Sequence, residues 1–350
     1  MHRYYTRACN FYYGNQSKEL VNKKKTIPLS QIKEISFDQV EIITRKSKKK
    51  ININQIKNLP RSLKSKVESD IQKIKSSKKN FSHFNFKKIP NILGVLNLTP
   101  DSFSDGGKYN TKKKATERAI QLFDQGSNLI DIGGESTRPG SKSINDKTEW
   151  NRIKKILKLL SKKVPISLDT RKSKIMKKGI KLGVKLINDV SGLSYDSETI
   201  NVLKNYKIPF VIQHTQGNPD NMQKNPKYMN ELLDVYDFFE EKIKLIRSKG
   251  IRHNNIILDP GIGFGKNLKH NMNLIRGISI FHSLGFPILV GNSRKRFIKE
   301  ISGINDSKFR IGGTLASSIF LMSQGVQILR IHDVNELIQG IKTYKEIIKN

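Results

Sequence analysis

Residues 91–107 read NILGVLNLTPDSFSDGG, and the rest of the chain repeats the pattern that this stretch sets. The apolar run 92–98 predicts a buried β-strand, which ends near the polar Asn97 and is followed by Pro100 and a loop rich in Ser, Asp and Gly. From there to Asn350 the same order recurs: a short apolar run, a polar residue at its end, a small-residue loop and a longer Lys-rich amphipathic segment. The pattern predicts strands that alternate with helices in an α/β fold.

Eight strand candidates follow one another beyond residue 90. They lie at residues 92–98, 128–133, 165–169, 186–190, 209–214, 255–259, 287–291 and 327–332. Helical patterns separate them, the clearest at residues 112–125, 146–160, 172–182, 229–249, 310–323 and 334–348. Eight such units over about 260 residues fit a (β/α)8 TIM barrel. An open doubly wound sheet is the alternative, and the absence of GxGxxG after the first strand disfavours it.

Residues 1–88 lack this pattern and form a basic N-terminal extension ahead of a barrel at 89–350. Within the extension, residues 37–45 and 51–56 alternate as strands do, and residues 60–79 carry apolar positions at helical spacing. A small α+β domain and a partly disordered basic arm are both compatible with this composition. The sequence of the extension indicates no role for it.

The chain is strongly basic, with 65 Lys and Arg residues against 30 Asp and Glu residues and a formal net charge of +35. Such a charge is typical of proteins that bind nucleic acid or anionic membranes. Here Lys is spread over the predicted helix surfaces, which favours a compositional bias of the whole chain. Residues 76–88, SSKKNFSHFNFKK, interleave aromatic residues with Lys, and a linker docked on the barrel is the favoured interpretation. We therefore expect no specific nucleic-acid partner.

Cysteine content and hydropathy narrow the class of protein. Cys9 is the single cysteine, which excludes an internal disulfide and any metal site built from paired cysteines. The chain has no apolar run of about 18 residues, as a membrane-spanning helix would need. The N-terminus, MHRYYTRACNFYYGN, lacks the apolar core of a secretory signal. The expectation is a soluble cytoplasmic protein without membrane contact.

Each strand candidate carries a polar residue at or near its C-terminal end. These residues are Asn97, Asp131, Asp169, Asn188, Asp189, His214, Asp259, Asn292, Arg330 and His332. In a TIM barrel the active site lies at this end, because the βα loops gather there. A polar residue on all eight strands therefore predicts a polar pocket. Arg330 and His332 share one face of the last strand, so both can face the pocket, which makes an ion pair between Arg330 and Asp333 less natural.

Three loops that follow strand candidates give more specific indications of function than the single strand-end residues do. The loop 133–141, GGESTRPGS, combines small residues and hydroxyls with Arg138, which suits an anion. The loop 291–297, GNSRKRF, adds Ser, Arg and Lys after the seventh strand, where barrel enzymes often bind phosphate. The loop 259–267, DPGIGFGKN, resembles a P-loop but does not satisfy GxxxxGK[ST], since Asn follows its Lys. Together the loops favour an anionic small substrate over nucleotide hydrolysis.

Seven motifs follow one another between residues 91 and 350. They read NLTPDSFSDGG, IDIGGESTRPGS, SLDTRK, INDVSG, LDPGIGFGKN, GNSRKRF and RIHD. In this order they resemble the dihydropteroate synthase family of folate biosynthesis. The resemblance implies a transferase with a (β/α)8 barrel that joins 6-hydroxymethyl-7,8-dihydropterin pyrophosphate to p-aminobenzoate and releases pyrophosphate. It also implies Mg2+ as cofactor, a homodimer, and inhibition by sulfonamides, which mimic p-aminobenzoate.

The resemblance further implies roles for residues in these motifs. The pterin ring would be read by Asp259, Asp169, Asn188 and Lys295. The pyrophosphate would be held by Thr137, Arg138, Arg330 and His332, with Mg2+ at Asn97. The p-aminobenzoate slot would be formed by Phe264, Pro139 and Ser293, with Ser293 at the carboxylate. Asp101 would complete the site when its loop closes, and the expected catalytic residues are Asp101, Lys295 and Arg330.

One departure and two alternatives qualify the resemblance. Gln213 and Thr215 flank His214 where the family often has Met, which makes one wall of the pterin pocket more polar. A pterin-domain methyltransferase that uses methyltetrahydrofolate would share the barrel but would not need the STRPG and SRK loops. A basic RNA-binding protein on an inactive barrel would not need a polar residue on every strand.

Overall fold

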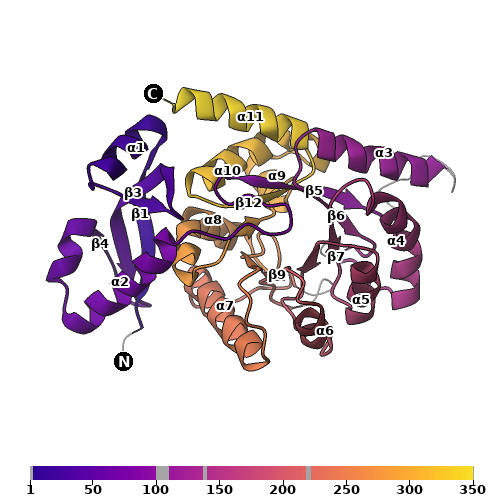
Figure 1. Ribbon diagram of the computed structural model, residues 1–350, viewed down its shortest axis with the longest axis horizontal. Coiled ribbons are helices and arrows are strands. Elements are labelled where there is room, and N and C mark those ends of the chain that lie inside the picture. The colour runs from indigo at the N-terminus through magenta and orange to yellow at the C-terminus, as the bar shows by residue number, and fades with distance from the viewer. Residues whose placement is uncertain (1–2, 100–109, 137–139, 218–221, 350) are drawn as a thin grey trace.

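The structure is a computed structural model, and it describes residues 3–99, 110–136, 140–217 and 222–349, apart from the side chains of residues 110 and 111. The C-terminal part of the chain forms a barrel, and the N-terminal part forms a smaller α+β domain that lies against one side of it (Figure 1). Among the described residues, no helix is long and apolar enough to cross a membrane.

Eight parallel strands form the barrel in the spatial order β10-β9-β8-β7-β6-β5-β12-β11. Their bounds are β5 (Asn91–Asn97), β6 (Leu129–Gly133), β7 (Ile166–Asp169), β8 (Leu186–Asp189), β9 (Phe210–Gln213), β10 (Ile256–Asp259), β11 (Leu289–Val290) and β12 (Ile328–Ile331). A parallel bridge between Leu258 and Ile288 brings the two ends of this order together. The (β/α)8 architecture and the eight strand positions predicted from the sequence are confirmed, and the open doubly wound sheet is excluded.

Helices follow the strands and cover the outside of the barrel (Figure 1). They are α3 (Asn110–Asp124), α4 (Asp146–Leu160), α5 (Ser173–Lys181), α6 (Thr199–Tyr206), α7 (Glu231–Ser248), α8 (Leu268–Arg276), α9 (Arg296–Ser302), α10 (Ile311–Ser323) and α11 (Val334–Ile347), with short 3-10 helices at η3 (Ile278–Leu284) and η4 (Ser307–Phe309). Helices α6, α8 and α9 are not among the clearest helical patterns of the sequence. Each has nine residues or fewer, so its apolar period repeats too few times to stand out.

Aromatic side chains from the linker before β5 close the bottom of the barrel. Phe84 and Phe86 are almost fully buried and join one apolar cluster with the inward-facing residues near the start of the strands. Those residues are Leu93, Leu129, Leu186, Val211, Ile257, Leu289 and Ile328. The expectation that residues 76–88 dock on the barrel is confirmed. Because this end is filled by apolar side chains, polar chemistry is left to the opposite end.

The N-terminal domain is an antiparallel sheet with two helices. Its elements are β1 (Tyr5–Tyr13), α1 (Gly14–Asn22), β2 (Ile27–Leu29), β3 (Ile32–Ile43), β4 (Lys48–Asn52), the 3-10 helix η1 (Ile53–Asn58) and α2 (Arg61–Lys75). β3 pairs with the other three strands. The domain is therefore α+β rather than a disordered arm over its described part. The strand predicted at 51–56 is wrong beyond Asn52, because Asn52 and Gln55 form a capping box that starts η1.

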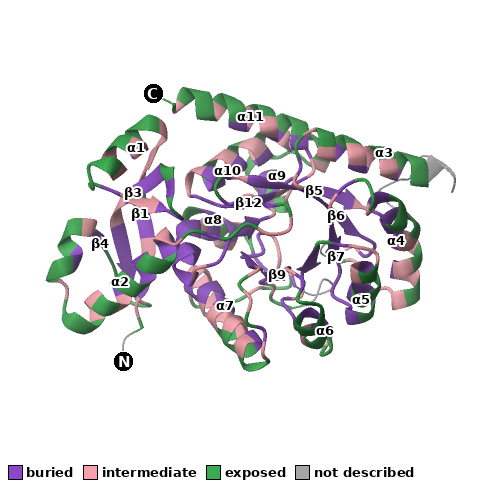
Figure 2. Cartoon of the chain, viewed as in Figure 1, coloured by how far each residue is buried: buried purple, intermediate pink, exposed green. Residues whose placement is uncertain are grey.

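The N-terminal domain and the barrel share a core. Tyr5 and Ile43 belong to the same apolar cluster as the barrel, and the ring of Tyr5 meets Tyr236 edge to face at 5.2 Å. Figure 2 shows buried residues along β1 and β3 beside the barrel. Arg45, in the turn after β3, adds ion pairs of 2.7 Å to Asp234 and Asp237 on α7. No sequence pattern indicated β1, because its polar and aromatic residues do not form a clear alternation.

Candidate active site

Polar residues from β7, β8 and β12 meet inside the barrel around Asp131 on β6. Asp131 is fully buried. It accepts hydrogen bonds from Ser167 Oγ at 2.6 Å, Asn188 Nδ2 at 3.0 Å and Arg330 Nε at 2.7 Å. One carboxylate therefore fixes side chains from three other strands, β7, β8 and β12. Asp131 was noted in the sequence only as a strand-end residue, without a role in the site.

Arg330 lies between two buried carboxylates. Its Nη2 donates to Asp169 Oδ2 at 2.8 Å while its Nε holds Asp131. Burial raises the pKa of Asp169 to about 7, with Arg330 opposing the rise and Asp131 adding to it. Burial by itself would lower the pKa of Arg330, but Asp131 and Asp169 raise it above its ordinary value. Asp333 pairs with Arg294 instead, so the sequence-based preference against an Arg330–Asp333 pair is confirmed.

Asp259 ends β10 and is 3% exposed. Its Oδ1 accepts a hydrogen bond from Gly261 N at 2.8 Å. Burial raises the pKa of the carboxyl to about 6, while the Gly261 N–H and the charges of Lys295 and Arg330 act against the rise. Gly261 has a φ of +66°, and a Cβ there would lie 1.9 Å from the backbone oxygen of His214, so only glycine fits.

Lys266 holds the Gly-rich loop that follows Asp259. Its buried ammonium lies 2.8 Å from the Phe264 oxygen and 3.0 Å from both the Gly261 oxygen and His214 Nδ1. Burial lowers the pKa of Lys266 to about 7, with Asp259 opposing the change. The Lys that made this loop resemble a P-loop therefore stabilises the loop itself through internal hydrogen bonds.

Two further contacts shape the mouth of the barrel. The ammonium of Lys295 lies 4.1 Å from the centre of the Phe264 ring, a cation–π contact that aligns the loops after β10 and β11. Ser293 Oγ lies 3.1 Å from His332 Nδ1 and accepts a hydrogen bond from His332 N at 3.2 Å. Both pairs consist of residues that the sequence assigned to the site.

A cavity of about 560 Å3 opens at this end of the barrel. Six residues named from the sequence line it: Asn97, Phe264, Ser293, Lys295, Arg330 and His332. Asp169, Asn188 and Asp259 are buried at the neighbouring strand ends, two of them in the network around Asp131 and Arg330. Four predicted site residues lie outside the described residues: Asp101, Thr137, Arg138 and Pro139. The predicted polar pocket is present where the strand ends placed it.

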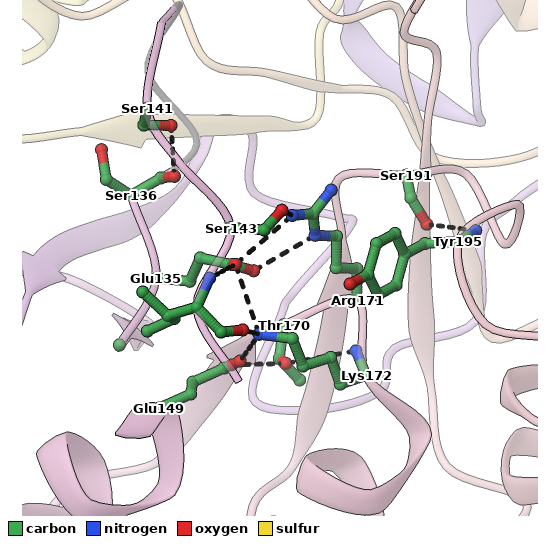
Figure 3. A network of polar contacts seen from close by, with 12 residues as sticks. Glu135, Ser136, Ser141, Ser143, Glu149, Thr170, Arg171, Lys172, Ser191 and Tyr195 are labelled. Carbon is green, nitrogen blue, oxygen red and sulfur yellow. Dashed lines mark hydrogen bonds and ion pairs between the residues drawn. The ribbon is translucent and has the colours of Figure 1, made fainter. Parts of the chain in front are cut away.

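Sequence reasoning missed a buried ion network beside the cavity, drawn in Figure 3. Arg171 Nε lies 3.1 Å from Glu135, and Lys172 Nζ lies 2.6 Å from Glu149. The ring of Tyr195 covers the Arg171 guanidinium at 4.0 Å. Burial would raise the pKa of Glu135, but Arg171 and a backbone N–H hold it below its ordinary value. The available signal was Glu135 shortly after β6 and the adjacent pair Arg171 and Lys172 shortly after β7.

Hydrogen bonds of this network connect the two ends of the loop after β6. Glu135 Oε1 accepts a hydrogen bond from Ile144 N at 2.9 Å, and Arg171 Nη2 donates to Ser143 Oγ at 2.6 Å. Residues at the two ends of the loop are thus linked through one carboxylate and one guanidinium. The tip of the loop, residues 137–139, lies outside the described residues.

The described residues contain no group of three His, Cys, Asp or Glu side chains arranged to hold a metal ion. Asn97, at the end of β5, lines the cavity and offers one amide oxygen. Mg2+ commonly takes only one or two protein ligands and completes its shell with phosphate oxygens and water. The donor set therefore suits Mg2+ that arrives with a phosphorylated substrate, rather than a metal held by the protein alone.

Comparison with known proteins decides the family. A sequence profile of the pterin binding enzymes matches residues 93–332. The dihydropteroate synthase of Synechocystis sp. is 38% identical over 261 residues, which cover 74% of this chain and 90% of that protein. The chain belongs to the dihydropteroate synthase family. It is therefore a transferase.

Solved structures of dihydropteroate synthases support the same assignment. The Yersinia pestis enzyme, solved as a sulfonamide drug complex, matches with a TM-score of 0.71 and 35% identity, covering 76% of this chain and 96% of that one. The Xanthomonas albilineans enzyme, solved with 7,8-dihydropteroate, matches with a TM-score of 0.68 and 29% identity, covering 75% and 95%. Neither the methyltransferase nor the RNA-binding alternative is favoured by these relatives.

Proposed function

We propose that this chain condenses 6-hydroxymethyl-7,8-dihydropterin pyrophosphate with p-aminobenzoate to give 7,8-dihydropteroate and pyrophosphate. The observation that carries the proposal is the cavity lined by the cations Lys295 and Arg330 and the donor His332, together with the buried acid Asp259, on which the charges of both cations act. A pterin with a pyrophosphate needs both: an acid for the N–H groups of the ring and cations for the phosphates. Two relatives were solved with a sulfonamide drug and with 7,8-dihydropteroate, and the second compound is the product of the proposed reaction.

In this proposal the pterin ring binds at the ends of β7, β8 and β10. Asp259 would accept two N–H groups from the guanidine-like edge of the ring, since a carboxylate matches that edge in a bidentate manner. Asp169 and Asn188 would read the remaining edge, and Lys295 would reach the carbonyl side. Asn188 is bonded to Asp131, and Asp169 is linked to Asp131 through Arg330, which supports rigid recognition of that edge.

The leaving group would lie across Arg330 and His332, with Thr137 and Arg138 from the neighbouring loop. Asn97 would contact Mg2+, and the ion would supply positive charge to the pyrophosphate when bound. Breaking the bond between the pterin methylene carbon and the pyrophosphate oxygen leaves both bonding electrons on the oxygen. Arg330 and His332 would stabilise that charge as it develops.

The p-aminobenzoate would occupy the outer part of the cavity. Phe264 and Pro139 would flank its ring and Ser293 would bind its carboxylate. Its amine nitrogen would form a bond to the methylene carbon and then lose one proton. Lys295 contacts the ring of Phe264 and would lie between the pterin and p-aminobenzoate, and Asp101 would close the site from the loop after β5.

We propose a homodimer that forms through α9, α10 and α11. Large apolar side chains are exposed on or beside these helices, namely Ile301, Ile304, Phe309, Phe320 and Ile347. A groove between α10 and α11 is lined by Ile311, Leu315 and Tyr344 among others. Apolar surface of this kind is typical of subunit interfaces. Analytical ultracentrifugation of the protein and of Phe309→Ser would test the assignment.

Two smaller assignments accompany this function. A cytoplasmic location is supported by the single cysteine, since secreted proteins of oxidising compartments commonly carry disulfides. Association with nucleic acid would be electrostatic and non-specific, because the Lys residues are spread over the helices. Cell fractionation and filter binding at several salt concentrations would test the two points.

Release of pyrophosphate is the direct test of the reaction. The protein is mixed with the pterin pyrophosphate, p-aminobenzoate and Mg2+, and pyrophosphate and dihydropteroate are measured together. We expect both products in equal amounts, and neither when p-aminobenzoate or Mg2+ is left out. Pyrophosphate release without dihydropteroate would indicate a hydrolase and contradict the proposal.

A further inference from the structure

Gln213, the last residue of β9, carries a buried amide nitrogen without a hydrogen-bond partner among the described residues. The residue is 3% exposed, and its Nε2 is buried and makes no hydrogen bond within the described part of the chain. A buried donor that lost its water without gaining an acceptor destabilises the fold, and such groups are rare in native proteins. A bound ligand can supply the missing acceptor.

The alternation of the strand places this amide inside the barrel. Val211, two residues earlier, belongs to the apolar cluster that fills the interior, and residues two apart share a face of a strand. Ile257 and Asp259 stand in the same relation on β10. Gln213 is in direct register with Asp259, so the two side chains project side by side, with strands about 5 Å apart.

A second unpartnered atom lies on the strand on the other side of β9. Asn188, on β8, donates a hydrogen bond from its Nδ2 to Asp131. Its Oδ1 is buried and makes no hydrogen bond with the described residues. Reading from β8 to β10, the barrel thus presents an acceptor on Asn188, a donor on Gln213 and an anion on Asp259. A flat ring that carries donors and acceptors along its edge can satisfy all three at once.

We propose that Gln213 is a further pterin-binding, specificity-determining residue of this chain. Its Nε2 donates to the ring acceptor, carbonyl oxygen or ring nitrogen, that adjoins the N–H groups bound by Asp259. The inference rests on the proposed function and deepens it. A carboxylate recognises donors alone, whereas carboxylate and amide together recognise a donor beside an acceptor. The apolar Met that the family often has at this position could not make this contact.

Gln213→Met tests the proposal, because Met keeps the volume and removes the amide. The probe is 6-hydroxymethylpterin, titrated by calorimetry, with thermal unfolding measured on the same samples. We expect the dissociation constant to rise roughly three- to tenfold, the loss of one neutral hydrogen bond. We expect the melting temperature of the ligand-free protein to stay the same or to increase, because an unsatisfied buried donor has been removed.

Gln327→Met is the matched control. Gln327 is also fully buried with an Nε2 that has no partner among the described residues, but it precedes β12 at the opposite end of the barrel, where its Oε1 accepts a hydrogen bond from Ile288 N. The control should not change pterin affinity. The proposal is overturned if Gln213→Met binds the pterin as the natural chain does, or if it lowers the melting temperature, which would make Gln213 a structural residue. If the natural chain neither binds the pterin nor releases pyrophosphate, the proposed function fails instead.

Discussion

The guanidinium of Arg330 lies 2.8 Å from the carboxylate of Asp169. The first residue is assigned to pyrophosphate and the second to the pterin ring, so the two halves of the substrate site share one charge pair. Asp131 holds the same guanidinium from the other side at 2.7 Å. A substitution of Arg330 should therefore affect binding in the pterin half of the site as well as in the phosphate half.

Replacing Arg330 should weaken binding of pterin and pyrophosphate together. In Arg330→Met, Asp131 and Asp169 remain buried without their cation, so one of them takes up a proton and becomes a poorer acceptor. We expect the affinity for 6-hydroxymethylpterin, which has no phosphate, to fall about tenfold or more. His332→Gln is the control, since His332 does not touch Asp169. Unchanged pterin affinity in Arg330→Met, measured by calorimetry, would show that the pterin half of the site does not depend on Arg330.

Asp259→Asn should remove the main anchor of the pterin. The change keeps the size of the side chain but replaces one acceptor by a donor that faces the ring N–H groups. Charge-assisted hydrogen bonds contribute about 1.5–3 kcal/mol each, so pterin affinity should fall roughly ten- to a few-hundredfold. Asp38→Asn makes the same chemical change in the N-terminal domain and should have no effect. Normal pterin affinity in Asp259→Asn would place the ring elsewhere.

Pterin affinity should depend on pH in a direction set by the two buried acids. The pKa of Asp169 is raised to about 7 and that of Asp259 to about 6. The ring donors bind the ionised carboxylates, so affinity should approach its full value at about pH 8 and decrease as the pH falls through 7 and then 6. In Asp259→Asn the lower part of this decrease should disappear. A titration series from pH 5 to about 8 measures both, and a flat profile would contradict the assignment.

The sequence predicted the barrel well because the signals were local and repeated. An apolar run with a polar residue at its end identifies a strand and its reactive end together, as at Asp259. Contacts between side chains on different strands or loops could not be predicted from these local patterns. The role of Asp131 depends on the approach of Arg330, 199 positions away, and the pairing of Glu135 with Arg171 depends on how two loops fold together.

The bottom of the barrel should depend strongly on Phe84. It is 2% exposed and packs in the interior cluster, so Phe84→Ala should lower the free energy of unfolding by about 3–5 kcal/mol. Phe81→Ala, at a partly buried position of the same cluster, should cost clearly less. A chain beginning at Phe86 would lose both rings and the shared core around Tyr5, and should be insoluble. Urea unfolding measures the point variants, and a soluble, active truncated chain would contradict this view.

Arg171 should act on the phosphate half of the site through the loop after β6. Its guanidinium joins Glu135 to Ser143, one residue at each end of the loop that carries Thr137 and Arg138.

In Arg171→Met the two ends lose this link, and Glu135 remains buried with less positive charge around it. The affinity for Mg2+-pyrophosphate should fall roughly tenfold, while 6-hydroxymethylpterin, bound at the strand ends, should bind as before. Arg171→Lys should recover part of the loss through its remaining charge. Lys178→Met removes an exposed cation over Trp150 and serves as the control. Equal loss of pyrophosphate and pterin affinity in Arg171→Met would show general damage to the barrel rather than a specific effect on the loop.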